Sequence, residues 1–180
     1  MREYLKIARE AIKSHFLGES LNREFLLDEF PELKNEGASF VTLTQNGQLR
    51  GCIGSIIAHR PLLDDIIGNA ISSAFKDPRF APLSEDEFKN IRVELSILTA
   101  PKVLNYRDID DLKSKIHVGI DGVIIKQAYH QATFLPQVWE ELNSFELFFA
   151  HLGQKAGLGR DYLNDFPEVK TYQVEKLKEE

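Results

Sequence analysis

The chain has 180 residues, in which 22 lysines and arginines are outnumbered by 28 aspartates and glutamates, giving a formal net charge of −6. This length suits one domain, and a hydrophobic content of 43% is too high for a disordered chain. Because the chain holds a single cysteine, an intrachain disulfide, a cysteine-rich zinc site and a CxxC redox pair are excluded. The acidic balance argues against nucleic acid as a partner, since nucleic-acid binders usually present a basic face.

The N-terminal segment predicts a cytoplasmic protein without a membrane partner. Residues 1–10 carry a charged side chain every few positions and lack the apolar run of a signal peptide. Elsewhere the apolar stretches are shorter than the roughly 18 residues that a membrane helix needs. A lone cysteine also fits the reducing cytoplasm.

The first part of the chain predicts two helices. Residues 3–17 place apolar side chains at helical spacing between charged ones, and Gly18 ends this pattern. Residues 20–31 predict a short helix that ends at Pro31.

A β-hairpin and a third helix follow. Residues 39–44 and 48–57 predict two strands around Asn46-Gly47, a dipeptide that suits a type I′ turn because both central positions need a positive φ. Pro61 then opens a helix, as proline commonly does at the first helical position.

The second half mixes strands, turns and helices. Ser84 and Glu87 form a capping box for a short helix, and residues 91–99 alternate apolar and polar side chains as a strand does. The remaining predicted elements are a short helix at 108–113, strands at 116–120 and 123–127 around the turn Asp121-Gly122, a strand at 131–135, a helix between Ser144 and Gly157, and a strand at 168–174 before the charged tail 175–180. Helices and hairpins alternate irregularly with short links, which predicts an α+β fold with a mostly antiparallel sheet and packed helices.

The segment 49–54, Leu-Arg-Gly-Cys-Ile-Gly, is the strongest candidate for a functional site. On a strand Arg50 and Cys52 share a face, and a guanidinium near a thiol favours the reactive thiolate. Gly51 and Gly54 weaken a strand, and glycines in strands often mark a close backbone approach or a bulge. The functional hypothesis is a reactive or ligand-contacting cysteine in a pocket opened by glycines. The alternative is a buried, inert cysteine beside packing glycines.

The same two glycines form a GxxG pattern, which in some RNA-binding domains clamps the nucleic-acid backbone. Such a loop joins two helices, whereas residues 51–54 lie in strand-like sequence. A second match at 119–122 shows how readily the pattern arises by chance at ordinary glycine usage. Nucleic-acid binding is therefore the weakest of the functional hypotheses.

Four further residues are candidates for chemistry near Cys52. Arg79 can clamp a carboxylate or phosphate while Asp77 orients it, or the pair can stabilise its own loop. Glu94 lies on the polar face of its strand, as a general acid or base or as a solvated side chain. His59 is the histidine best placed in the sequence as a base for Cys52, with a solvated loop histidine as the alternative. The five histidines show no HxxxH or HxH spacing, so we expect no metal site.

Seven sequence blocks occur in the order typical of one known family. They are Phe40-Val-Thr-Leu, Leu49-Arg-Gly-Cys-Ile-Gly54, Ala58-His-Arg-Pro-Leu62, Asp77-Pro-Arg-Phe80, Val93-Glu-Leu-Ser-Ile-Leu-Thr99, Thr133-Phe-Leu-Pro-Gln-Val138 and Lys155-Ala-Gly-Leu158. The chain thus closely resembles the AMMECR-one domain family over residues 3–175. Within that family it resembles the bacterial type, protein A of the AmmeMemoRadiSam system.

The resemblance implies one domain over residues 1–180, in which an antiparallel sheet with packed helices is joined closely to a smaller β-rich subdomain. It also implies that segment 49–54 lies at a cleft between these two parts. Carried over to this chain, the candidate site consists of Arg50, Gly51, Cys52, Ile53 and Gly54, with Asp77, Arg79, Glu94 and His59 nearby. Memo-like and radical-SAM proteins are the implied partners through a shared pathway, which is an association rather than a mechanism. The resemblance implies no particular reaction or cofactor.

Two main functions stay open on these grounds. In the first, the protein is an enzyme or an enzyme accessory that uses Cys52 as a nucleophile or covalent carrier on a small anionic substrate. In the second, it is a non-catalytic module that binds a small ligand or a partner protein through the same cleft. The residues assigned to catalysis are Cys52, Glu94 and His59, and those assigned to ligand binding are Arg50, Gly51, Gly54, Asp77 and Arg79.

Overall fold

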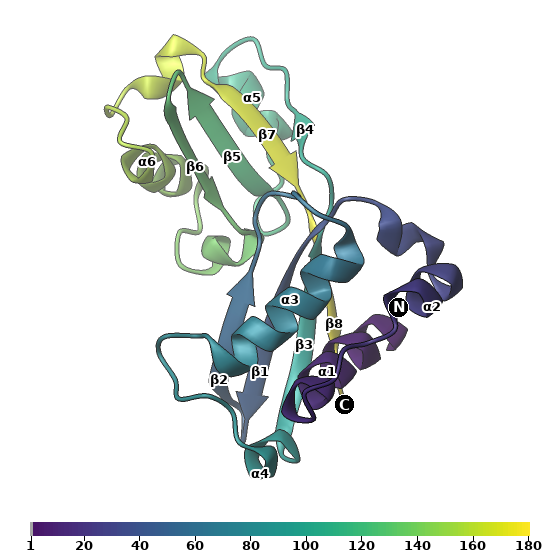
Figure 1. The fold of residues 1–180 in the computed structure, drawn as a ribbon. Coiled ribbons are helices and arrows are strands. Elements are labelled where there is room, and N and C mark those ends of the chain that lie inside the picture. Colours follow the sequence, from purple (N-terminus) through teal and green to yellow (C-terminus); the bar gives the residue numbers. More distant parts are fainter. Residues whose placement is uncertain (1) are drawn as a thin grey trace. The chain divides into compact units, whose positions relative to one another are not determined.

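The structure, a computed structural model, describes residues 2–180 and divides the chain into two compact units (Figure 1). The first unit runs to Leu98 and includes Glu175–Glu180, and the second is Thr99–Val174. Each unit has a four-stranded sheet and a hydrophobic core of its own, which confirms the α+β class. Among residues 2–180, no helix combines the length and the apolar character that crossing a bilayer requires.

The sheet of the first unit has the strand order β2-β1-β3-β8. Its strand β1 (Ala38–Gln45) pairs antiparallel with β2 (Gln48–Gly54) on one side and with β3 (Ile91–Leu98) on the other. Asn46 and Gly47 have φ values of 51° and 77°, so the predicted hairpin between β1 and β2 is confirmed.

The last strand of this sheet, β8 (Val174–Lys178), lies where the sequence predicted only a charged tail. Leu177 packs against the hydrophobic core. The Glu179 carboxylate accepts a hydrogen bond from the Val93 N–H at 2.8 Å and pairs with Arg9 at 2.6 Å. These partners are distant in the sequence, so no local pattern could indicate the strand.

Two long helices, α1 (Arg2–Phe16) and α3 (Leu62–Phe75), pack on one face of this sheet (Figure 1). Alternate side chains of β1 and β3 are buried in the core beneath them, because successive residues of a strand point to opposite faces. These buried side chains are Val41, Leu43, Val93 and Leu95.

Two shorter helices complete the first unit. The helix α2 (Arg23–Glu29) begins at Asn22, whose side chain caps its first turn. The helix α4 (Glu85–Phe88) begins with the predicted capping box, in which the Ser84 and Glu87 side chains each accept a backbone N–H of the other residue.

The sheet of the second unit has the order β4-β7-β5-β6, and its paired strands are antiparallel. The helices and strands of this unit are β4 (Lys102–Val103), α5 (Ile109–Lys115), β5 (Gly122–Gln127), β6 (His130–Phe134), α6 (Phe145–Lys155) and β7 (Glu168–Tyr172). Short 3-10 turns lie at Pro31–Lys34 in the first unit and at Pro136–Glu140 and Tyr162–Asp165 in the second. In the core of the second unit, Trp139 stacks on Phe148 with ring centroids 3.6 Å apart.

The predicted hairpin around Asp121-Gly122 is wrong, because residues 116–120 do not form a strand. The buried Asp121 carboxylate accepts the His117 N–H at 2.8 Å, and the Asp121 carbonyl accepts the Trp139 indole N–H at 2.8 Å. These bonds hold a turn in front of β5 and outweigh the local hairpin preference of the dipeptide. The hairpin of this unit instead joins β5 to β6.

Candidate functional site

The two glycines of segment 49–54 let other parts of the first unit approach β2 closely. A Cβ atom at Gly51 would lie 2.1 Å from the backbone oxygen of Ser73 in α3. A Cβ atom at Gly54 would lie 2.2 Å from the ring of Phe40 on β1. The predicted close backbone approach is therefore confirmed, and it assigns both glycines to packing within the chain. A role in ligand binding for either glycine stays a prediction.

Cys52 lies on the face of the sheet opposite to α3, because side chains alternate along β2 and Gly51 faces the helix. The residue is half-buried. Its cross-strand neighbour is Thr42, and 3.3 Å separates the thiol Sγ from the Thr42 Oγ1. The Thr42 hydroxyl thus fixes the direction of the thiol.

The backbone of Cys52 is held by the neighbouring Asp77-Pro-Arg79 segment. The Asp77 Oδ2 accepts the Cys52 N–H at 2.9 Å, and the Arg79 Nη2 lies 3.4 Å from the Cys52 carbonyl oxygen, to which it donates. The guanidinium also binds the Asp77 carboxylate through two hydrogen bonds of 3.0 and 2.7 Å. Since β2 is an edge strand, this Asp77–Arg79 clamp covers the outward backbone groups that an edge leaves unpaired.

Electrostatics reinforce this clamp. The side chain of Asp77 is 2% exposed, whereas that of Arg79 is 54% exposed. The Arg79 guanidinium, assisted by the N–H groups of Cys52 and Arg79, holds the pKa of the Asp77 carboxyl well below its usual range despite burial. The alternative that this pair stabilises its own loop is therefore supported, and in addition the pair reaches Cys52.

Arg50 occupies a bulge of β2, because Leu43 pairs with Gly51 whereas Thr44 pairs with Leu49. Its guanidinium makes two hydrogen bonds to the Glu87 carboxylate, at 2.9 and 3.0 Å. Arg50 thus ties β2 to α4. That this guanidinium favours the thiolate of Cys52 stays a prediction.

The ring of Phe80 lies close to both guanidinium groups, with its centroid 5.7 Å from the Arg50 Cζ and 5.5 Å from the Arg79 Cζ. Arg50 lowers the pKa of Glu87 to about 2, chiefly through its hydrogen bonds. Each arginine is therefore neutralised by a carboxylate of its own chain, and the charge available for an anionic ligand is reduced.

Glu94 lies on the same sheet face as Cys52, and it is the cross-strand partner of Thr42 on β3. Its carboxylate pairs with the Lys178 ammonium of β8 at 2.9 Å. We call Cys52, Thr42, Glu94 and Lys178 the polar row, because β2, β1, β3 and β8 each contribute one of its members. Neighbouring strands lie about 4.8 Å apart, so Glu94 is about 10 Å from Cys52, too far for direct proton transfer.

His59 is exposed on the loop that follows β2, and its Nδ1 lies 3.1 Å from the Ile57 carbonyl oxygen. The thiol of Cys52 makes its hydrogen bond with Thr42 rather than with His59. Residues 2–180 contain no group of three histidine, cysteine, aspartate or glutamate side chains that could hold a metal ion.

Two members of the polar row were not predicted. Thr42 lies in a segment that the resemblance had already marked, so strand alternation could have placed it opposite Cys52 once the β1–β2 register was known. Lys178 belongs to the charged C-terminal segment, which gives no local sign of its pairing with Glu94.

The comparisons with known proteins agree on one family. The model of the AMMECR1 family matches residues 5–177. A protein of Methanothermobacter thermautotrophicus is 40% identical over 176 residues, or 97% of this chain and 90% of the relative. A protein of Methanosarcina barkeri is 40% identical over 181 residues, or 99% of this chain and 89% of the relative. The crystal structure of an uncharacterized protein from Pyrococcus horikoshii matches with a TM-score of 0.77 and 34% identity, over 98% of this chain and 90% of that one. This chain therefore belongs to the AMMECR1 family.

Proposed function

We propose that this protein is an enzyme, or an accessory component of one, that uses the Cys52 thiol as a nucleophile or covalent carrier for a small anionic substrate. The observation that carries this proposal is the double anchoring of Cys52. The Asp77–Arg79 clamp binds both of its backbone polar groups, and Thr42 orients its thiol. A reacting group needs this kind of fixed geometry, whereas a cysteine that only fills space does not.

The polar row suggests how the chemistry would be divided. Cys52 and Glu94 are about 10 Å apart, with Thr42 between them. A substrate that lies over Thr42 can therefore touch both side chains, and the distance between them corresponds to a small molecule. Glu94 would move the proton, and His59 on the adjacent loop is the alternative carrier. Lys178 would supply positive charge for the anionic group, together with the exposed side of Arg79.

The proposal includes a cytoplasmic location, where a single thiol stays reduced. It also includes a shared pathway with Memo-like and radical-SAM proteins, as the family resemblance implies.

Whether a bound anion protects the Cys52 thiol from alkylation tests the proposed class of substrate. The wild-type protein is mixed with small anions such as phosphate, citrate and succinate, and the rate of Cys52 alkylation is followed by intact mass. We expect at least one anion to slow alkylation and to raise Tm, since a ligand at 100 times its Kd adds about 2.7 kcal/mol of stability. The Lys178→Ala variant should lose this protection. Equal alkylation rates with every anion would contradict a small anionic substrate at Cys52.

The alternative function is a non-catalytic ligand-binding module. It is favoured by one observation, namely that Glu87 and Asp77 neutralise Arg50 and Arg79, so the arginines serve the fold first. In that case the Cys52→Ser variant should bind the protecting anion, detected by its Tm shift, as tightly as the wild type does. A thiol-dependent ligand would instead lose its Tm shift in this variant.

A further inference from the structure

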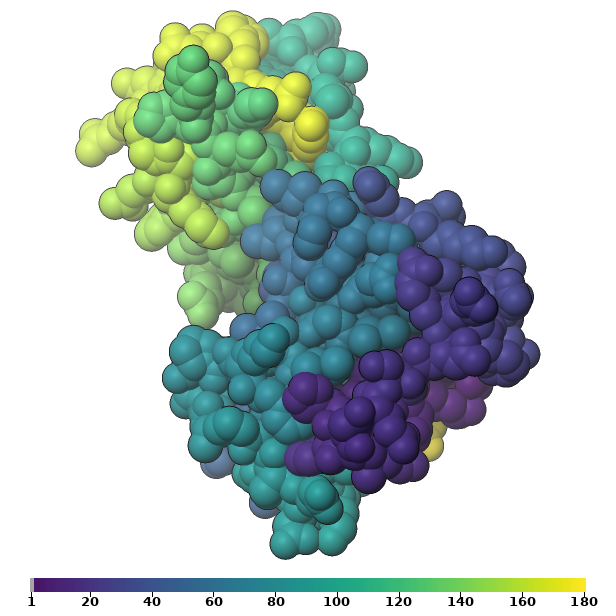
Figure 2. Space-filling view, in the orientation of Figure 1, coloured from purple at the N-terminus to yellow at the C-terminus, as the bar shows by residue number. Residues whose placement is uncertain are grey.

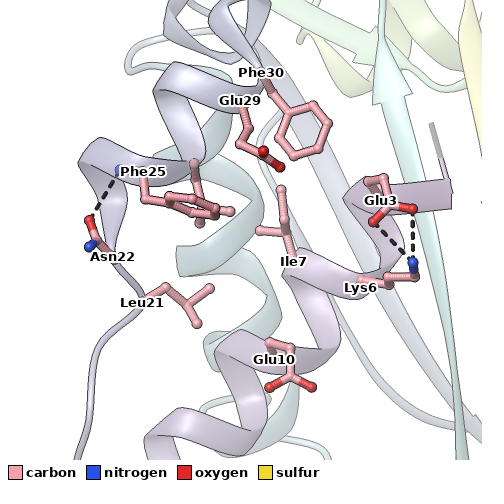
Figure 3. Close-up of a pocket in the computed structure, with 10 residues that line it drawn as sticks. Glu3, Lys6, Ile7, Glu10, Leu21, Asn22, Phe25, Glu29 and Phe30 are labelled. Carbon is pink, nitrogen blue, oxygen red and sulfur yellow. Dashed lines mark hydrogen bonds and ion pairs between the residues drawn. The ribbon is translucent and has the colours of Figure 1, made fainter.

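A groove of about 340 Å³ lies between α1 and α2 in the first unit (Figure 3). Its walls are the two helices and the chain segment that leads into α2. None of the polar row or the Asp77–Arg79 clamp lines it, so the function proposed for Cys52 leaves this groove unexplained. In Figure 2 the N-terminal residues, in purple, form part of the visible surface of the first unit.

The lining of the groove is largely apolar. Ile7 lies on the α1 side, and Leu21 and Phe30 lie beside α2 (Figure 3). Leu26, a residue of α2, also lines the groove. Phe25 also lines the groove, although 58% of its surface is exposed to solvent. An exposed aromatic side chain beside an apolar groove is typical of a contact that a partner protein buries.

Acidic side chains surround this apolar lining. Three carboxylates, those of Glu3, Glu10 and Glu29, line the groove together with a single ammonium group. That ammonium group belongs to Lys6, which donates to Glu3 at 2.8 Å. Lys13, which does not line the groove, pairs with Glu10 at 3.6 Å, so Glu29 is the carboxylate that faces a partner most directly. The segment 19–36, which contains α2, holds six acidic and two basic residues, a net charge of −4. The helix α1 holds four basic and two acidic residues, a net charge of +2, so the negative charge lies on the α2 side of the groove.

We propose that this groove is the docking surface for a basic amphipathic helix of a partner protein. Such a helix would place its apolar side chains against Phe25 and Ile7 while its lysines or arginines meet the surrounding carboxylates. The trough between two helices is a shape that a third helix fills. The negative charge of segment 19–36 repels anionic membranes and nucleic acids, so charge complementarity on the α2 side selects a basic protein segment.

A model peptide tests this surface in the full chain. The probe is a fluorescent helix of about four turns, built from leucine on one face and lysine on the other. Its control has the same leucine face and glutamate in place of lysine. We expect the lysine peptide to bind at least tenfold more tightly in fluorescence anisotropy. In NMR spectra it should shift the backbone signals of residues 3–10 and 21–30.

Two pairs of variants locate the binding. Phe25→Ser should weaken binding of the lysine peptide by about tenfold, which corresponds to 1.4 kcal/mol. Its control, Phe166→Ser in the second unit, removes a phenylalanine of equal exposure (59%) and should leave affinity unchanged. Glu29→Lys should weaken binding, whereas Glu140→Lys, which changes an exposed glutamate of the second unit, should not. All four positions are at the surface, so the variants should keep the fold.

Three results would overturn the proposal. The first is the absence of binding by the lysine peptide. The second is equal binding of the glutamate peptide, which would show an apolar site without charge selection. The third is non-specific adhesion of the peptide. It would appear as an equal loss of affinity in Phe25→Ser and Phe166→Ser, or as NMR shifts outside residues 3–30.

Discussion

The buried carboxylate of Asp77 accepts the backbone N–H of Cys52 at 2.9 Å, and this bond joins two sequence blocks that lie 25 residues apart. It places the Asp77–Arg79 clamp at the outer edge of β2, so the edge strand is covered and the thiol is held on the sheet face. The block Asp77-Pro-Arg-Phe80 thus positions Cys52 through its backbone.

The first prediction concerns the charge of this clamp. Asp77→Asn should lower the free energy of unfolding by about 2–3 kcal/mol, because it leaves Arg79 without its carboxylate and weakens a buried charge-assisted bond. Urea unfolding measures this change. Asp86→Asn is the matched control, since Asp86 is 92% exposed and pairs with a surface lysine. If both variants changed the free energy of unfolding by less than about 0.5 kcal/mol, the clamp would contribute nothing to stability and the prediction would be wrong.

The second prediction concerns acid stability. The pKa of Glu87 is lowered from 4.5 to about 2, so its pairing with Arg50 contributes fully above pH 4.5 and is lost as the pH falls through about 2. The stability difference between wild type and Glu87→Gln should therefore be constant near neutrality and shrink below pH 4.5. Unfolding curves between pH 7 and pH 2 measure it, and a difference that grows on acidification would contradict the assigned ion pair.

The third prediction concerns the close approach of α3 to β2. Gly51→Ala should lower the free energy of unfolding by about 3 kcal/mol or more, because its methyl group would meet the backbone oxygen of Ser73, which has no flexible side chain to move. Gly159→Ala is the control, since nothing lies within 4 Å of its added Cβ. If Gly51→Ala were as stable as Gly159→Ala, the packing described here for Gly51 would be wrong.

The fourth prediction concerns the orientation of the thiol. Thr42→Val keeps the shape of the side chain and removes the hydroxyl that lies 3.3 Å from Sγ, so it should lower the alkylation rate of Cys52 severalfold at unchanged stability. Thr42→Ser retains the hydroxyl and should restore the rate. Thr44→Val, on the same face of β1, should leave the rate unchanged, and a rate insensitive to all three substitutions would remove Thr42 from the proposed site.

Local signals predicted the elements whose geometry depends on neighbouring residues. Asn46-Gly47 determined its hairpin, and Ser84 with Glu87 marked the start of α4, because turn and cap bonds close within a few residues. The resemblance to the family then identified the blocks that contain Cys52, Asp77 and their neighbours.

Long-range contacts explain what the sequence could not show. The pairing of β8 with the first sheet depends on Leu177 and Glu179, which meet partners far away in the chain. Asp121 formed a buried turn instead of a hairpin because its carboxylate and carbonyl bind His117 and Trp139. Glu87 binds the Arg50 guanidinium through two hydrogen bonds across 37 residues of sequence, so no local pattern could indicate this ion pair either.

The reactivity of Cys52 is the central claim, and one measurement tests it most directly. Because the chain has a single cysteine, intact mass after treatment with iodoacetamide reports Cys52 alone. The alkylation rate is measured at pH 7 for the folded protein and for the same chain unfolded in urea. We predict that the folded protein reacts at least tenfold faster, because the clamp and Thr42 hold the thiol in a fixed orientation. A folded protein that reacts no faster than the unfolded chain would contradict the claim and leave Cys52 as a packing residue.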